Sequence, residues 1–98
     1  MTRQTVPADF SGEDAIQLRR KRALYRAAHR GTKEMDLMLG RYGEAKLGGM
    51  TEAELTVFEA LLEEQDPEIN QWLFSPETCD QGRYQELISA LRSFNSIG

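Results

Sequence analysis

The chain has 98 residues, of which 40% are hydrophobic and 29% are charged, a balance typical of one globular domain and not of a disordered chain. Cys79 is the single cysteine, which excludes an internal disulfide. The net charge is -4, and no apolar run approaches the ~20 residues needed to cross a bilayer, so we predict no direct membrane insertion.

The first ten residues show no hydrophobic periodicity and include Pro7. We therefore predict a flexible N-terminal tail over residues 1–10 and a single helical domain over residues 11–98. The tail has no apolar segment of a secretory signal and is too poor in Arg and Ser for a transit peptide. These features favour a cytoplasmic protein, with the mitochondrial matrix as the less favoured alternative because no transit peptide is seen.

A first helix is predicted from an N-cap at Ser11 to about His29. Glycine just past a helix end is the usual left-handed cap, so Gly31 ends this helix. The apolar stripe is thin and consists of Ile16, Ala23, Leu24, Ala27 and Ala28.

A second helix begins after a cap at Thr32, with acidic Glu34 and Asp36 in its opening turns. Gly40 and Gly43 weaken this helix by about 1 kcal/mol each relative to alanine, and a close-packed neighbour would explain them. One buried face is predicted from apolar residues at i, i+3, i+4 and i+7, which are Met35, Met38, Leu39 and Tyr42.

Three more helices follow the break at residues 48–49. Thr51 and Glu54 form a capping box for the third helix, and Asp66 is predicted to cap a short fourth helix with Pro67 at its first position. The last helix has the most regular apolar spacing, at Tyr84, Leu87, Ile88, Leu91 and Phe94. The predicted fold class is all-α, a compact bundle of about five short helices without strands.

The sequence offers no catalytic set. His29 is the single histidine and Cys79 the single cysteine, and nothing in the pattern links the two as base and nucleophile. One histidine and one cysteine also cannot form a zinc site at the usual spacings, and no calcium loop or nucleotide fingerprint is present. We predict that the protein is not an enzyme and holds no metal.

Charge is unevenly distributed along the chain. Residues 51–70 hold seven acidic residues and no Lys or Arg, which predicts one face that attracts anionic surfaces and one that repels them. Six cationic residues between positions 19 and 30 form a basic block. The block could bind nucleic acid, dock on an acidic protein or be a solvated helix face. Because the chain is acidic overall and lacks a helix-turn-helix pattern, we predict no nucleic-acid partner. The basic block consists of Arg19, Arg20, Lys21, Arg22, Arg26 and Arg30.

The connection between the first two helices, residues 30–34, has two interpretations. A helix end needs a glycine and a helix start favours a glutamate, so the pattern can be purely structural. Alternatively, Gly31 forms a bare knuckle that enters a partner's cleft, with Arg30 and Glu34 making directional hydrogen bonds on each side.

At this connection the sequence resembles the succinate dehydrogenase flavinylation factors, which carry an RGxxE motif. The resemblance covers about residues 15–75. It rests on Arg30-Gly31-x-x-Glu34, on Arg22 and Leu24-Tyr25-Arg26 before it, on Glu34-x-Asp36-x-x-Leu39-Gly40-Arg41-Tyr42 after it, and on Thr51, Leu61-Leu62-Glu63-Glu64, Asp66-Pro67 and Trp72.

The resemblance implies a five-helix assembly factor that binds the flavoprotein subunit of succinate dehydrogenase, with fumarate reductase as a natural second client. It implies that the factor promotes covalent attachment of FAD while the client performs the chemistry, and that the factor has no cofactor of its own. Arg30, Gly31 and Glu34 are then the client-contacting motif. The weaker candidates for partner binding are Asp36, His29, Arg26 and Arg22, whereas Trp72 is expected in the core. The alternative function is a small regulator that binds nucleic acid or an acidic protein through its basic first helix.

Overall fold

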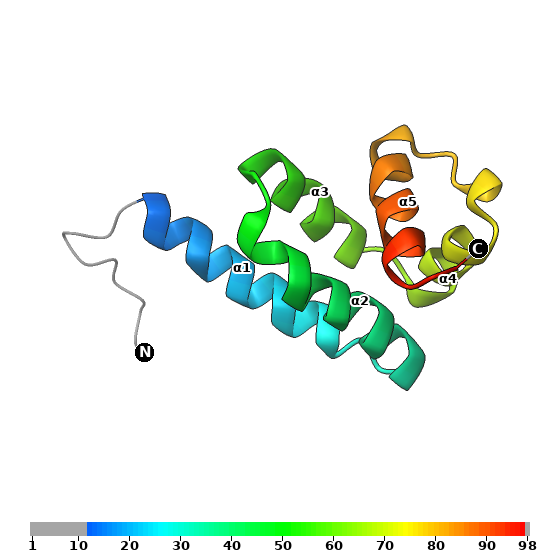
Figure 1. Cartoon of the computed structure of the whole chain (residues 1–98), viewed down its shortest axis with the longest axis horizontal. Helices are drawn as coiled ribbons and strands as arrows, with labels where there is room; N and C mark the ends of the chain where they lie inside the picture. The colour runs from blue at the N-terminus through cyan, green and yellow to red at the C-terminus, as the bar shows by residue number, and fades with distance from the viewer. Residues whose placement is uncertain (1–11, 98) are drawn as a thin grey trace.

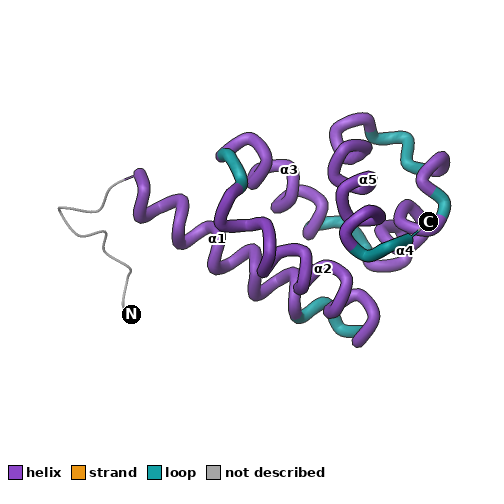
Figure 2. The backbone as a smooth tube through the Cα atoms, in the orientation of Figure 1, coloured by secondary structure: helices purple, strands orange, loops and turns teal. Residues whose placement is uncertain are grey.

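The structure, a computed structural model, describes residues 12–97, in which there are five α-helices and no strand (Figures 1 and 2). This confirms the predicted all-α class. The expected tail at residues 1–10 and the expected N-cap at Ser11 lie outside the described residues. In chain order the elements are α1 (Gly12–Ala28), α2 (Lys33–Lys46), η1 (Leu47–Gly49), α3 (Glu52–Leu62), α4 (Asp66–Phe74), η2 (Pro76–Thr78), η3 (Gly82–Tyr84) and α5 (Gln85–Phe94).

Local capping chemistry sets two of the helix starts as predicted. The Thr32 hydroxyl accepts the Met35 N–H at 3.3 Å and caps α2. At α3 the capping box is complete: the Thr51 hydroxyl accepts the Glu54 N–H at 3.1 Å, and the Glu54 carboxylate accepts the Thr51 N–H at 2.8 Å. The Thr32 cap and the α3 capping box satisfy backbone donors that have no partner inside the helix.

The prediction for the start of α4 was wrong by one residue. The N-cap is Gln65, without a side-chain cap bond, and Asp66 and Pro67 are the first two helical residues. The Asp66 carboxylate accepts a hydrogen bond from the Arg30 side chain at 2.9 Å and makes no capping bond to the backbone of α4. A tertiary contact has therefore replaced the local one.

Helices α1 and α2 lie side by side and antiparallel, with small residues at their contact (Figure 1). Ala23 and Ala27 of α1 are buried, and so are Gly40 and Gly43 of α2. A Cβ atom on Gly40 would come 3.0 Å from the Cα of Ala28. The predicted close-packed neighbour is thus the α1 backbone for Gly40, whereas a Cβ on Gly43 would meet the side chains of Leu47 and Leu24.

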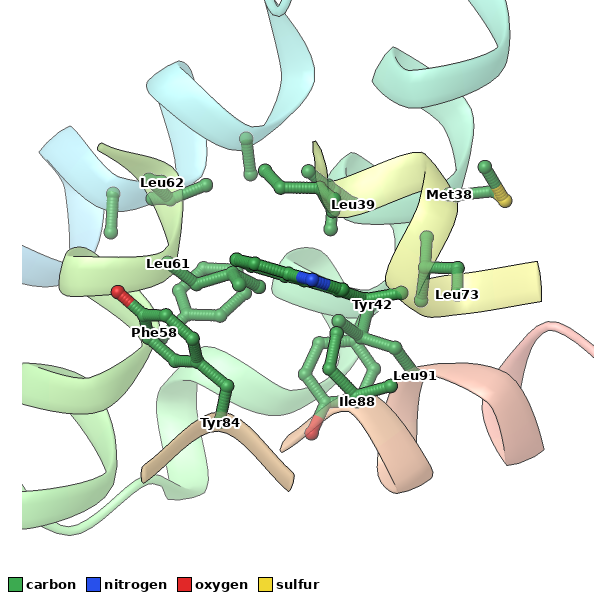
Figure 3. Close-up of a cluster of buried hydrophobic side chains, with 14 of the residues drawn as sticks. Met38, Leu39, Tyr42, Phe58, Leu61, Leu62, Leu73, Tyr84, Ile88 and Leu91 are labelled. Atoms are coloured by element: carbon green, nitrogen blue, oxygen red, sulfur yellow. The ribbon is translucent and has the colours of Figure 1, made fainter. Parts of the chain in front are cut away.

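The main core lies where α2, α3, α4 and α5 meet, as the labelled side chains of Figure 3 show. Its largest fully buried side chains include Phe58 and Tyr84, and Trp72 is 6% exposed, which agrees with its expected place in the core. Aromatic rings contact one another across elements: Tyr42 meets Phe58 at 6.0 Å and Trp72 meets Tyr84 at 5.6 Å between ring centroids. Such pairs add to the stabilisation from apolar burial.

The predicted separation of a basic face from an acidic face is incorrect. Arg19 of α1 donates to Glu59 of α3 with two hydrogen bonds, at 2.7 and 3.1 Å, and lies 3.2 Å from Glu52. The hydrogen bond to Glu59 raises the pKa of the Arg19 guanidinium. Arg26 pairs with Glu63 at 2.6 Å. The basic helix therefore packs along the acidic one, and the two charge runs neutralise each other.

Polar contacts also fix α5. The Tyr84 hydroxyl donates to the Glu64 carboxylate at 2.8 Å, beside the junction of α3 and α4. Arg92 donates to the Leu73 carbonyl at the end of α4, and the Asn95 amide donates to the Met38 carbonyl of α2 at 3.4 Å. These bonds join α5, together with Tyr84 of the preceding η3 and Asn95 that follows, to the α3–α4 junction, to α4 and to α2.

No helix within residues 12–97 combines the length and the apolar character required to traverse a lipid bilayer.

The α1–α2 contact predicts the effect of Gly40→Ala. Alanine gains about 1 kcal/mol in helix propensity, but its Cβ would press on the α1 backbone, and overpacking of this kind costs about 1–3 kcal/mol. We expect the free energy of unfolding, measured by urea denaturation, to fall by about 1 kcal/mol. Gly48→Ala is the control because its Cβ meets nothing within 4 Å. Equal or greater stability for Gly40→Ala would contradict the close contact.

The Tyr84–Glu64 bond predicts a loss of stability at alkaline pH. Burial, reinforced by this hydrogen bond, raises the pKa of Tyr84 from 10.0 to about 12. The neutral phenol is thus favoured by folding, so its contribution is complete below about pH 10 and is lost as pH rises toward 12. We expect the free energy of unfolding to fall by on the order of 2 kcal/mol over this window. In Tyr84→Phe this part of the pH dependence should disappear; an unchanged profile would show that other groups cause it.

Candidate functional site

The connection between α1 and α2, residues 30–34, presents bare backbone at the surface; we call it the corner. Gly31 has φ 121°, a conformation that side chains of L-residues rarely adopt, and an added Cβ there would meet nothing within 4 Å. Thr32, Lys33 and Glu34 are all exposed. Gly31 is therefore required by the turn, and the space above it is open to a partner.

The Asp36 side chain binds the backbone of the corner. One carboxylate oxygen accepts the backbone N–H groups of both Arg30 and Gly31, the latter at 3.2 Å. Because Asp36 lies in the first turn of α2, its charge also suits the positive end of that helix. The predicted partner-binding residue Asp36 is thus placed as a support for the corner.

Arg30 points away from Glu34 and into the molecule. Its side chain is only 10% exposed. The guanidinium donates to the Asp66 carboxylate at 2.9 Å, to the Leu62 carbonyl at 2.7 Å and to the Glu64 carbonyl at 2.9 Å. We call this set of bonds the Arg30 clamp. The expected pairing of Arg30 and Glu34 at one surface knuckle is not what the structure shows, because the end of α3 and the start of α4 draw the guanidinium inward.

Glu34 remains at the surface. Among the described residues its carboxylate makes no hydrogen bond or ion pair, and the side chain lies in the first turn of α2. An exposed carboxylate on a rigid helix start, next to an open glycine, can accept hydrogen bonds from a partner's cationic or N–H groups.

A second exposed surface follows the outer side of α1, opposite its buried alanines. Leu18, Arg22, Tyr25 and His29 fall at intervals of four, three and four residues, so they share one helix face, which we call the outer α1 stripe. Tyr25 is 64% exposed and its ring stacks on His29 with centroids 4.0 Å apart. The His29 Nδ1 donates to the Tyr25 carbonyl at 2.8 Å. This stripe leads directly to the corner.

The sequence analysis found Arg22 and His29 but missed Tyr25 and Leu18 as surface residues. A helical spacing could have found them, because both lie outside the predicted core stripe of the first helix. Arg26 lies on the side that faces α3, where it pairs with Glu63 while remaining partly exposed.

The basic block is largely occupied within the fold. Arg19, Arg26 and Arg30 bond to acidic residues of α3 and α4, and Arg20 donates to the Met50 carbonyl at 2.9 Å. In the described part of the chain only Lys21 and Arg22 of this block are without such partners. The alternative of nucleic-acid binding through the first helix loses most of the cations on which it relied.

Within residues 12–97 the single histidine and the single cysteine lie in different environments. His29 is exposed on α1, whereas Cys79 is buried, with its thiol 3.6 Å from the Gln81 carbonyl. No group of histidine, cysteine or carboxylate side chains that could hold a metal ion occurs in the described region.

A groove of about 780 Å³ lies between α2, α3 and α5. Its floor is apolar and includes Tyr42, whose pKa is raised by burial. Both signs of charge occur in its lining, from Lys46 and Arg83 and from Glu54 and Glu86.

Several known proteins resemble this chain over about two thirds of its length. It is 48% identical over 62 residues to the FAD assembly factor SdhE of Acetobacter pasteurianus, covering 63% of this chain and 57% of that protein. It is 35% identical over 72 residues to the mitochondrial succinate dehydrogenase assembly factor 2 of Debaryomyces hansenii, covering 74% of this chain and 50% of the yeast protein. The SdhE protein of Coxiella burnetii is 30% identical over 67 residues, covering 68% of this chain and 82% of that protein.

The chain spans about half the length of the first two of these relatives. No solved structure matches it. The family model described as the flavinator of succinate dehydrogenase matches residues 21–95, which include the second half of α1, the whole corner and all later helices. The chain therefore belongs to the family of succinate dehydrogenase flavinators.

Proposed function

We propose that this protein is an assembly factor that binds the flavoprotein subunit of succinate dehydrogenase and promotes covalent attachment of FAD. The observation that carries the proposal is the family match across the corner and the four helices that follow it. The relatives named FAD assembly factor SdhE support a role in flavinylation. Fumarate reductase, whose flavoprotein is chemically similar, is the proposed second client.

In this proposal the factor is not an enzyme and has no cofactor of its own. The client holds the FAD and the histidine that becomes bonded to it, and the factor holds the client in a productive arrangement. The exposed features that suit this role are Gly31 and Glu34 at the corner and the adjoining outer α1 stripe, with its Arg22, Tyr25 and His29 side chains. An aromatic side chain and an arginine are typical anchors of protein interfaces.

The proposed place of action is the bacterial cytoplasm, where a succinate dehydrogenase flavoprotein is assembled. The relatives from fungi carry the word mitochondrial in their names, so the mitochondrial matrix is the corresponding alternative.

The first experiment removes the factor from the cell. In a deletion strain we expect the succinate dehydrogenase flavoprotein to be present but to lack covalent flavin, detected by in-gel flavin fluorescence against an immunoblot of the same subunit. A plasmid copy of the wild-type gene should restore the fluorescence. Full flavinylation without the factor would exclude the proposed function.

The second experiment tests the corner with purified proteins. We expect Glu34→Ala to weaken binding of the flavoprotein subunit by about tenfold or more, because a charge-assisted hydrogen bond is lost. Glu77→Ala, at an exposed glutamate of η2, is the matched control and should bind normally. If the protein instead used its basic helix on an acidic partner, loss of Glu34 would leave binding unchanged or improve it.

The third experiment separates close approach from backbone strain at Gly31. Both Gly31→Arg and Gly31→Ala carry the strain of φ 121°, about 1–3 kcal/mol of stability. The Ala Cβ has open space, so Gly31→Ala should retain client binding, whereas the long side chain of Gly31→Arg should block it in a protein that is still folded. Binding is measured by titration calorimetry. If Gly31→Arg bound the client as tightly as Gly31→Ala and wild type do, no partner would approach this glycine.

A further inference from the structure

The motif arginine is poorly placed to contact a client. Three hydrogen bonds of the Arg30 clamp occupy the guanidinium, one from each of its nitrogens, and nine-tenths of the side chain is covered. The clamp uses three of the five guanidinium N–H donors, and the other two belong to the same covered side chain, so a client carboxylate could reach Arg30 only by opening the clamp. Leaving buried polar groups unpaired is unfavourable, so the clamp resists opening.

We propose that Arg30 is a positioning residue: it fixes the corner against the junction of α3 and α4 and so orients Gly31 and Glu34 for the client. This inference rests on the proposed function. It divides the motif into an inward-facing arginine that sets the geometry and an outward-facing glycine and glutamate that make the contact.

The corner is held at two points, and Arg30 supplies both. Its backbone N–H and that of Gly31 donate to the Asp36 carboxylate in α2. Its side chain donates to the Leu62 carbonyl at the end of α3. Without the side-chain bonds, the corner would be tied only to α2. The turn at Gly31 could then move relative to α3 and α4.

The far side of the clamp completes two helix ends. Leu62 and Glu64 present carbonyl groups at the C-terminal end of α3, where a cation is favoured, and Asp66 lies in the first turn of α4, where an anion is favoured. A planar guanidinium can bond in all three directions at once, whereas a lysine ammonium on a flexible stem cannot reproduce the fork.

The same junction also carries α5. Glu64, whose carbonyl accepts from Arg30, receives the Tyr84 hydroxyl on its carboxylate at 2.8 Å. Arg30 and Tyr84 therefore share Glu64 as a partner, which links the corner to the start of α5. Coupling of this kind passes through packed groups that share partners.

The experiment measures client affinity for Arg30→Ala, Asp66→Asn and the double variant. Asp66→Asn keeps the size of the side chain and removes the ionic partner of Arg30 at a site away from the corner surface. We expect each single variant to bind the flavoprotein subunit about tenfold more weakly, and the double variant to bind little worse than either, because the two share one interaction. Arg19→Gln, which removes an α1–α3 ion pair far from the corner, should bind normally.

Two further readouts separate positioning from a direct contact or a purely structural role. Arg30→Lys keeps the charge but loses the fork, so we expect it to bind as weakly as Arg30→Ala. The salt dependence of the association rate should be the same for wild type, Arg30→Lys and Asp66→Asn, since no charge that faces the client has changed. Fluorescence of Trp72, in α4, reports whether each variant is folded.

Full affinity in Asp66→Asn would overturn the inference, as would full affinity in Arg30→Lys. A lower salt dependence in Arg30→Ala would also do so, because it would indicate direct contact. If Arg30→Ala does not fold, Arg30→Lys and Asp66→Asn decide alone. Failure of wild-type protein to bind the subunit, or normal binding by Glu34→Ala, would instead count against the proposed function.

Discussion

The position of the corner depends most on the Arg30 clamp, because it bonds the corner to the α3–α4 junction more than thirty residues further along the chain. The guanidinium neutralises the partial charge at the end of α3 and the carboxylate at the start of α4, while the backbone of the same residue leads into the corner. A buried arginine without these partners would be strongly unfavourable. The clamp therefore specifies one arrangement of the corner against the α3–α4 junction, and the rest of α4 and α5 follows from that junction.

The charges of the molecule make sense only once the helices are packed. The basic block of α1 and the acidic run of α3 could each have been a surface for a partner of opposite sign. Instead Arg19 and Arg26 meet Glu59 and Glu63, so each run is partly neutralised by the other. What remains for recognition is local: one open glycine, one exposed carboxylate and a stripe with a stacked tyrosine and histidine. This favours a shaped protein partner over an extended polyanion.

Helix positions could be predicted from the sequence because the rules that set them act over a few residues. Apolar spacing, the Thr51 capping box and the glycine at position 31 each operate within one or two helical turns. The Arg30–Asp66 bond joins residues 36 apart, and the Arg19–Glu59 bond joins residues 40 apart. No local pattern encodes such pairs. Asp66 is an example: the local pattern predicted a helix cap, whereas in the fold its carboxylate binds Arg30, 36 residues earlier in the chain.

At the candidate site, too, a local sequence pattern does not reveal the long-range contacts of a side chain. The spacing Arg30-Gly31-x-x-Glu34 marks the corner correctly, but it cannot tell which side chain faces out. The positive φ of Gly31 reverses the chain between the end of one helix and the start of the next, so residues three or four apart here do not share a face as they would within a helix. Arg30 thus falls on the inner side and Glu34 on the outer side. In the proposed function the client performs the chemistry, so the factor would act through shape and orientation. The Arg30 clamp would fix the corner from the inside, and Gly31 and Glu34 would then meet the client in one defined orientation.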